Sequence, residues 1–212
     1  VFHTHPVAIL ALTNQKNGDE LIQKATGGKT IVIPYVMSGF PLALQISRSL
    51  KHNKDNNTIV VLKHGVFTFG DTAQDAYDSM IRVVTNSEKF IRSTRKKLKT
   101  NPRKPSFKLE NLAPVLRGAL ISSSATEQRY ILSFRNSPVI KNFLGFGNLS
   151  RLVKCGPVTP DHAIWTKPKA LFLPSNCNSI EIVRAVKNYK RDYERYFEKN
   201  NRRYSGKKVM RD

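Results

Sequence analysis

The sequence predicts an α/β protein, in which the strands of one sheet alternate along the chain with helices that cover it. Two short segments, residues 29–35 and 58–66, are rich in β-branched residues and follow clusters of glycine or asparagine, as buried strands do. Each is followed by a segment with apolar residues at intervals of three or four, which is typical of an amphipathic helix. A length of 212 residues is enough for one domain with a substantial core, or for a domain with an appendage.

The first part of the chain contains the elements of this sheet. The predicted elements are, in chain order, a strand over residues 1–5, a helix over 7–12, the strand over 29–35, a helix over 41–50 and the strand over 58–66. Thr72 then follows Gly70 and Asp71 as the N-cap of a further helix. The buried face of that helix is expected to carry apolar residues at helical spacing: Ala73, Ala76, Tyr77, Met80, Ile81 and Val84.

A basic, proline-containing stretch divides the chain. Residues 92–108 include eight Lys or Arg and no acidic residue, and Pro102 and Pro105 disfavour a continued helix. We therefore predict a domain over residues 1–98, a Pro/Lys linker over 99–108 and a smaller α/β extension over 109–212. The elements predicted in the extension are strands over residues 130–134 and 170–173, a helix over 138–153, and a long helix with Ile180, Val183, Val186, Tyr189, Tyr193 and Tyr196 on one face.

The positive charge lies mainly in the second part of the chain. The formal net charge is +21, yet residues 1–89 hold 9 basic and 7 acidic side chains, which leaves 27 basic and 8 acidic for residues 90–212. We interpret this excess as a solvated basic surface. The alternative is a nucleic-acid-binding face. Its basic residues would be Arg95, Lys96, Lys97, Lys99, Arg103 and Lys104, and later Lys187, Lys190, Arg191, Arg195, Arg202 and Arg203.

Cysteine content and hydropathy indicate a protein of the cytoplasm without membrane contact. Cys155 and Cys177 form neither a CxxC pair nor a dense framework, which fits a reducing compartment. No segment has the roughly 18–20 uninterrupted apolar residues of a membrane span, and the first residues lack the pattern of a signal peptide. The chain begins at Val1, within a predicted strand, so we expect the natural protein to extend further in the N-terminal direction.

Three histidines form the strongest candidate for a chemical site. His3 and His5 are two residues apart on a predicted strand, so their side chains project from the same face while Thr4 points away. Two such imidazoles can bind one divalent ion, at about 2.0–2.1 Å if it is zinc. The HxH pattern also occurs at ordinary solvated strand ends, but His64 lies at the end of the other apolar strand, where sites in α/β sheets assemble. Three imidazoles would leave a fourth position open for substrate.

The residues around these histidines resemble the class II aldolase/adducin family, which includes rhamnulose- and fuculose-phosphate aldolases. The resemblance covers about residues 1–92 and rests on three linked motifs, namely HTHP from His3, IPYVMSGFPLA from Ile33 and LKHGVFTFGDTAQDAY from Leu62. Later segments, LAPVLRGAL from Leu112 and GPVTPDHAIWTK from Gly156, are similar to bacterial proteins that fuse the aldolase module to a short-chain dehydrogenase. This similarity implies that a dehydrogenase domain follows Asp212 in the natural protein.

The resemblance implies a fold, a cofactor and a reaction. The fold would be a class II aldolase-like three-layer αβα sandwich, incomplete here, and the metal ligands would be His3, His5 and His64 around Zn²⁺ or another divalent ion. Family aldolases cleave a ketose 1-phosphate, such as rhamnulose 1-phosphate, to dihydroxyacetone phosphate and an aldehyde. Their glutamate general acid/base and their phosphate-binding residues precede the HxH pair, so we expect poor turnover from this chain. Family members commonly assemble as tetramers.

Three further residues are candidates for the catalytic site. His162 and Asp161 are adjacent in a TPDH segment, where they could act as a base or contact substrate or, more simply, belong to a capped turn. Tyr35 follows a predicted strand and is either a site residue or an aromatic residue of the core or rim. A non-catalytic, adducin-like interaction module remains an alternative to the enzyme, and the complete set of three histidines favours the enzyme.

Overall fold

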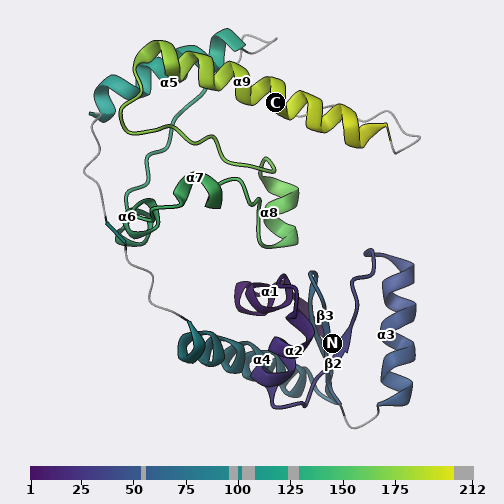
Figure 1. Ribbon diagram of the computed structural model, residues 1–212. Coiled ribbons are helices and arrows are strands. Elements are labelled where there is room, and N and C mark those ends of the chain that lie inside the picture. The colour runs from purple at the N-terminus through teal and green to yellow at the C-terminus, as the bar shows by residue number, and fades with distance from the viewer. Residues whose placement is uncertain (54–55, 96–99, 102–107, 124–128, 203–212) are drawn as a thin grey trace. The chain divides into compact units, whose positions relative to one another are not determined.

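The computed structural model describes residues 1–53, 56–95, 100–101, 108–123 and 129–202 (Figure 1). The chain forms two compact units. The first unit consists of Val1–Lys97 together with Pro157–Pro168, and the second consists of Leu98–Gly156 and Lys169–Asp212. The predicted linker over residues 99–108 lies outside the described part of the chain except for Thr100, Asn101 and Lys108.

The first unit is built on one mixed sheet. Its elements are β1 (Phe2–Thr4), α1 (Val7–Thr13), α2 (Gly18–Thr26), β2 (Ile31–Ile33), α3 (Phe40–His52), β3 (Thr58–Val61), β4 (Gly65–Thr68), α4 (Ala73–Thr94) and α8 (Pro160–Trp165). The strand order is β1-β4-β3-β2, with β2 parallel to β3 and the other two pairs antiparallel. The mixed α/β class predicted from the sequence is confirmed in this unit. Helix α2 was not predicted.

Helices pack on both faces of the sheet. Val60 and Val66 point toward one face, where they pack against Ile9 of α1, Ile22 of α2 and Met80 of α4. Ile59 and Val61 of β3 point toward the other face, where they pack against the apolar side of α3 (Figure 1). This second core consists of Ile33, Leu42, Ile46, Ile59 and Val61. Period-two alternation along β3 therefore supplies both cores.

The single strand predicted over residues 58–66 is instead a hairpin. β3 pairs with β4 in antiparallel register from Thr58 opposite Thr68 to Val61 opposite Gly65. The reversal takes place at Leu62–His64, where Lys63 adopts a left-handed conformation with φ of 60°. The prediction was wrong because apolar and β-branched residues continue through both strands and no Asn-Gly or Asp-Gly pair marks the turn.

The predicted cap of α4 is confirmed, and its predicted buried face is partly wrong. The Thr72 hydroxyl accepts from the amide of Asp75, whose carboxylate accepts from the amide of Thr72. Ala76 and Met80 are buried as predicted, but Ala73, Tyr77 and Ile81 are exposed. The buried face continues through Ser79, Val83 and Ser87. The spacing of apolar residues did not predict this face, because part of it consists of serines. A serine can be buried when its hydroxyl donates to a carbonyl of its own helix, as that of Ser87 does to Val83.

The described part of the second unit is helical, which corrects the predicted α/β extension. Its helices are α5 (Leu109–Ser123), α6 (Pro138–Leu144), α7 (Leu149–Leu152) and α9 (Ser179–Asn201). The helix predicted over residues 138–153 is interrupted between α6 and α7, at Gly145–Gly147. Residues 130–134 and 170–173 form no strand, because none of the segments that the structure describes pairs with them, and Ile131 is 97% exposed.

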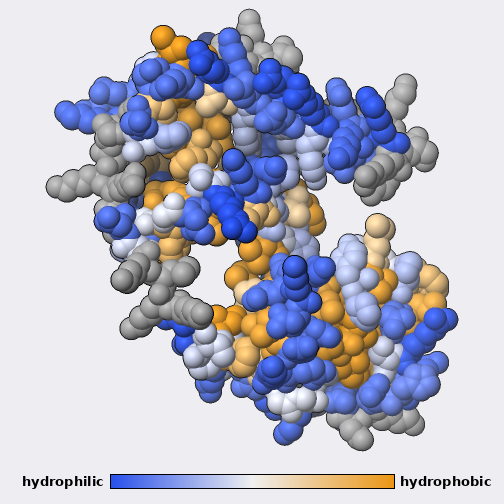
Figure 2. Space-filling model, viewed as in Figure 1, coloured by the Kyte–Doolittle hydropathy of each residue, from blue (hydrophilic) through white to orange (hydrophobic). Residues whose placement is uncertain are grey.

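The long C-terminal helix of the second unit is confirmed. α9 starts with a capping box formed by Asn178 and Glu181, and it packs against α5. Ile182 and Val186 are its buried residues, whereas Ile180 and Tyr196, predicted on the apolar face, are exposed. Hydrophilic residues cover the side of α9 in view in Figure 2. No helix in the described part of the chain is both long and apolar enough to cross a membrane.

Candidate metal centre

β1 carries His3 and leads directly into His5, and the two rings lie close together, with centroids 4.8 Å apart, as the HxH pattern predicts. His3 pairs with Phe67 of β4, and the two rings stack with centroids 3.7 Å apart and an angle of 4° between their planes. Thr4 points the other way and donates a hydrogen bond to Met80 Sδ at 3.2 Å on the α4 side. The position of His3 is therefore set by the antiparallel register of β1 with β4.

The hairpin turn brings His64 to the same place. The candidate ligand nitrogens of His3, His5 and His64 all lie within 4.8 Å of one another. The Nε2 atoms of His3 and His64 are 3.3 Å apart. Two nitrogens bound to one tetrahedral zinc ion, each at about 2.0–2.1 Å, would be separated by about 3.3 Å. The structure thus brings together the three histidines that the sequence singled out.

Gly65 makes this close approach possible. A Cβ atom at this position would lie 2.6 Å from the Thr4 carbonyl oxygen, 2.8 Å from His5 Cδ2 and 3.2 Å from His3 Cε1. Contacts of this length are shorter than van der Waals separations, and the first of them involves backbone. The glycine after His64 therefore has a steric role in the cluster that the sequence analysis missed. The only signal for it was its place immediately after a candidate ligand.

Hydrogen bonds at the Nδ1 atoms orient two of the rings. His3 Nδ1–H donates to the carbonyl oxygen of Val66 at 2.9 Å, and His5 Nδ1–H donates to Asp161 Oδ2 at 2.9 Å. A carbonyl and a carboxylate can only accept, so each ring carries its proton on Nδ1 when neutral and has a free lone pair on Nε2. This arrangement is the one in which outer-shell acceptors prepare histidine ligands for a metal.

The His5 Nε2 atom provides the test of whether the residues fit a cation. This atom is buried and has no hydrogen-bond partner among the described residues. A buried polar atom without a partner costs free energy, and a bound cation would remove that cost. Three imidazole nitrogens suit zinc or a similar divalent metal and leave one coordination position open. The residues therefore fit a divalent metal ion.

Partial loss of water contact favours the neutral form of two of the imidazoles. Loss of water contact lowers the pKa of His3 below 6.5, and this effect outweighs the hydrogen bond to Val66, which favours the charged form. Burial also lowers the pKa of His64, with further contributions from His3 and His5. Neutral imidazole is the form that coordinates metals. Both side chains are thus available as ligands at neutral pH without the loss of a proton.

These pKa shifts predict a pH-dependent stability of the metal-free protein. In the unfolded chain each imidazole binds a proton below its ordinary pKa of 6.5, whereas in the folded chain it does so only at lower pH. The unfolded state then holds more protons, so the free energy of unfolding decreases as the pH falls below 6.5. We expect the urea midpoint, measured with a chelator present, to decrease between about pH 7.5 and about pH 5. The decrease should be smaller in His64→Gln, and an equal decrease in both proteins would contradict the prediction.

The three other candidate residues lie at different places. Asp161, in α8, contacts the site through His5. His162 belongs to the start of the same helix, where its Nδ1 lies 2.6 Å from the hydroxyl of the N-cap, Thr159. Tyr35 is 55% exposed in the loop between β2 and α3, and the described contacts of the three imidazoles do not include it. The structure therefore brings only Asp161 to the histidine cluster.

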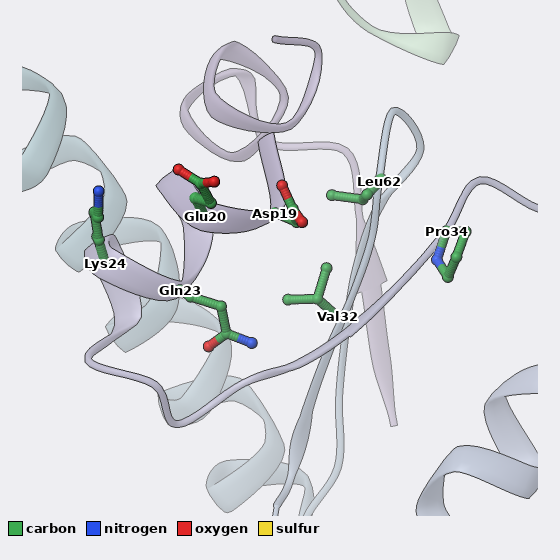
Figure 3. Close-up of a pocket in the computed structure, with 7 residues that line it drawn as sticks. All are labelled: Asp19, Glu20, Gln23, Lys24, Val32, Pro34 and Leu62. Atoms are coloured by element: carbon green, nitrogen blue, oxygen red, sulfur yellow. The ribbon is translucent and has the colours of Figure 1, made fainter. Parts of the chain in front are cut away.

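A separate pocket lies between α2 and β2 (Figure 3). It has a volume of about 630 Å³ and is lined by Asp19, Glu20, Gln23, Lys24, Val32, Pro34 and Leu62. Figure 3 shows the α2 side chains on one side of it and Val32 and Leu62 on the other. The lining includes Leu62, two residues before His64, but none of the three histidines. The metal centre is thus distinct from this pocket.

The fold and the site together define an α/β protein with a candidate three-histidine metal centre on one side of its sheet. Residues 1–89 match the family model for the class II aldolase and adducin N-terminal domain, and residues 108–212 match the model for the second domain of class II aldolases. The chain belongs to the class II aldolase/adducin family. The family resemblance noted in the motifs is confirmed.

Two further proteins are similar to parts of this chain. The uncharacterized oxidoreductase YuxG of Bacillus subtilis is 26% identical over 216 residues, which cover 94% of this chain and 31% of the relative. The chain therefore spans about a third of the length of that protein. The N-terminal class II aldolase domain of a conserved protein from Thermoplasma acidophilum is 40% identical, with a TM-score of 0.38, over 42% of this chain and 40% of the other.

Proposed function

We propose that His3, His5 and His64 bind one divalent cation, most simply Zn²⁺, and that this chain provides the metal centre of an aldehyde-lyase. The substrate would be a ketose 1-phosphate such as rhamnulose 1-phosphate, cleaved to dihydroxyacetone phosphate and an aldehyde. The observation that carries the proposal is the buried, unpartnered Nε2 of His5 beside the other two imidazoles, in a chain of the class II aldolase family.

The residues of the site have separable roles in this proposal. The three imidazoles would hold the cation, while the Val66 carbonyl fixes the tautomer of His3 and loss of water contact lowers the pKa of His3 and His64, which favours their neutral forms. When bound, the cation supplies a Lewis acid for the oxyanion that develops on the substrate as the C–C bond breaks. The hydrogen bond of Asp161 to His5 supports a positioning role for this carboxylate over a role in proton transfer.

Similarity to a longer relative supports the proposal that this chain is one module of a larger enzyme. The matched part of the Bacillus subtilis oxidoreductase is 31% of that protein, so we propose that this chain is the aldolase module of a protein that also carries a dehydrogenase. The complete three-layer sandwich and assembly as a homotetramer, both implied by the family resemblance, belong to the same proposal. Sedimentation velocity on the protein at its full encoded length tests the assembly.

The first test of the function is metal content followed by aldol cleavage. We expect the purified protein, at its full encoded length, to bind one equivalent of zinc and to release dihydroxyacetone phosphate from rhamnulose 1-phosphate. Chelation should abolish the release, and added zinc should restore it. Lack of stoichiometric metal would favour the adducin-like interaction module. Binding to DNA or RNA that weakens steeply with salt, without cleavage of the sugar phosphate, would favour the nucleic-acid alternative.

The structure offers one observation that bears on the nucleic-acid alternative. In α9, Lys190 contacts Glu194 at 4.0 Å and Arg195 contacts Asp192 at 3.9 Å, so part of the basic surface is paired within its own helix. These exposed pairs contribute little to stability. They reduce the positive potential that a phosphate backbone would meet. Lys96, Lys97, Lys99, Arg103, Lys104 and Arg203, which the sequence also placed on the basic face, lie outside the described residues.

A further inference from the structure

Asp161 contacts the metal centre from a distant part of the sequence. It lies 156 positions after His5 in the chain, within the residues that match the second family domain, whereas the histidines lie within the N-terminal family domain. The segment Pro157–Pro168 nonetheless belongs to the first compact unit. A second contact holds it there, because Asn14 Nδ2 donates to the carbonyl oxygen of Val158 at 2.9 Å.

The start of α8 holds the backbone of Asp161 in a defined place. Thr159 caps this helix, since its hydroxyl accepts from the amide of His162, and Pro160 occupies the first turn. Asp161 is the next residue, one turn or less from both the cap and the Asn14 contact. From this backbone position the Asp161 carboxylate presents an acceptor to His5 Nδ1 at 2.9 Å.

The contact has more effect on orientation than on stability. The Asp161 side chain is 59% exposed and that of His5 is 20% exposed. Ion pairs with such exposure contribute little to folding free energy. The direction of the His5 ring, in contrast, depends on it, because an imidazole without an acceptor at Nδ1 can take the other tautomer or turn its ring. Acceptors of this kind raise the basicity of a ligating imidazole and fix its direction.

We propose that Asp161 is a positioning residue of the metal centre, which holds His5 as the Nδ1–H tautomer and so directs its buried Nε2 lone pair to the cation. Through this residue, the second family domain completes a site whose ligands all come from the first. The inference rests on the metal site of the proposed function, but it does not depend on which sugar phosphate is cleaved.

The test combines zinc affinity with the tautomer of His5. Variants Asp161→Ala, Asp161→Asn and Asp161→Glu are compared with the natural chain, and Asp78→Ala removes an exposed carboxylate from α4 of the same unit as the control. Zinc affinity is measured by competition with a chelator, and the tautomer by ¹⁵N NMR of the metal-free protein. We expect Asp161→Ala to bind zinc roughly 10–100-fold more weakly, Asp161→Asn to be intermediate and Asp161→Glu to recover most of the loss. Asp78→Ala should bind like the natural chain.

The spectroscopic measurement separates positioning from a general structural effect. We expect the His5 ring to be protonated on Nδ1 in the natural chain and to lose this preference in Asp161→Ala, while circular dichroism stays unchanged. Unchanged zinc affinity in Asp161→Ala, or a loss of affinity with an unchanged His5 tautomer, would overturn the inference. If the natural chain binds no zinc, the proposed function fails. The ¹⁵N NMR measurement of the His5 tautomer then still shows whether Asp161 orients the His5 ring.

Discussion

Replacement of His64 by alanine is expected to abolish stoichiometric zinc binding. His64 lies in the turn between β3 and β4, and its Nε2 is 3.3 Å from that of His3, so the variant keeps at most two of the three imidazoles. Two imidazoles alone do not fill a zinc site that normally needs three or four protein ligands. The loss of affinity should exceed the roughly 10–100-fold that is typical for an outer-shell partner.

The measurement is titration calorimetry together with the metal content of the purified protein. His52→Ala is the matched control, because His52 is an exposed histidine at the end of α3 and is not among the clustered ligands. We expect this control to bind one equivalent of zinc with the affinity of the natural chain. One equivalent bound tightly by His64→Ala would show that the cluster is not the zinc site.

Replacement of Gly65 by alanine is expected to disrupt both the fold at β1 and the metal centre. The new Cβ would lie 2.6 Å from the Thr4 carbonyl oxygen, so β1 must move away from β4. β1 carries His3 and leads directly into His5, and its displacement separates both from His64. Steric overpacking of this kind typically costs about 1–3 kcal/mol, and we expect a value at the upper end because backbone has to shift.

Urea unfolding and zinc titration on the same samples test this prediction. Gly118→Ala is the control, since a Cβ at Gly118 in α5 meets nothing within 4 Å. An alanine within a helix is more favourable than glycine by up to about 1 kcal/mol, so the control should be unchanged or slightly more stable. If Gly65→Ala keeps both the natural urea midpoint and the natural zinc affinity, the steric role of Gly65 is wrong.

The three candidate ligands could be inferred from the sequence because two kinds of information agree. Strand alternation predicts His3 and His5 on the same face, and in the structure their ring centroids lie 4.8 Å apart. His64 lies 61 positions from His3, with no local periodicity to connect them, and it was singled out by its predicted place at the end of a strand and then by the family motifs. The predicted strand over residues 58–66 put His64 near the end of a strand. In the structure His64 lies in the turn between β3 and β4, so that reason for choosing it was wrong.

The outer shell of the site could not be inferred in the same way. The Val66 carbonyl has no sequence signal, because every residue has one, and its role depends on the position of β4 beside β1. Asp161 was noticed for its place beside His162, yet its partner proved to be His5, with which it shares no local segment. Each of these contacts depends on long-range pairing, which the spacing of residue types along a chain does not encode.

The second unit illustrates the same limit for secondary structure. Residues 130–134 and 170–173 have strand-like composition but form no strand, because a strand needs a neighbour to pair its backbone groups. The N-cap of α4 at Thr72, in contrast, was visible as a local pattern, and the periodicity of α9 predicted that helix although its capping box was not predicted. Helices satisfy their hydrogen bonds within one segment, so local sequence predicts them better than it predicts sheets.

For this protein, local patterns were enough to establish an α/β class with a sheet in its first part, a capped helix at Thr72, a long final helix and two histidines on one strand face. Folding in three dimensions added the β3–β4 hairpin, the clearance at Gly65 and the contact of Asp161 with His5. The physical reason is the range of the interactions involved. Side-chain periodicity and capping act within a few residues, whereas strand register, steric clearance and hydrogen bonds between distant segments arise only once the chain has packed.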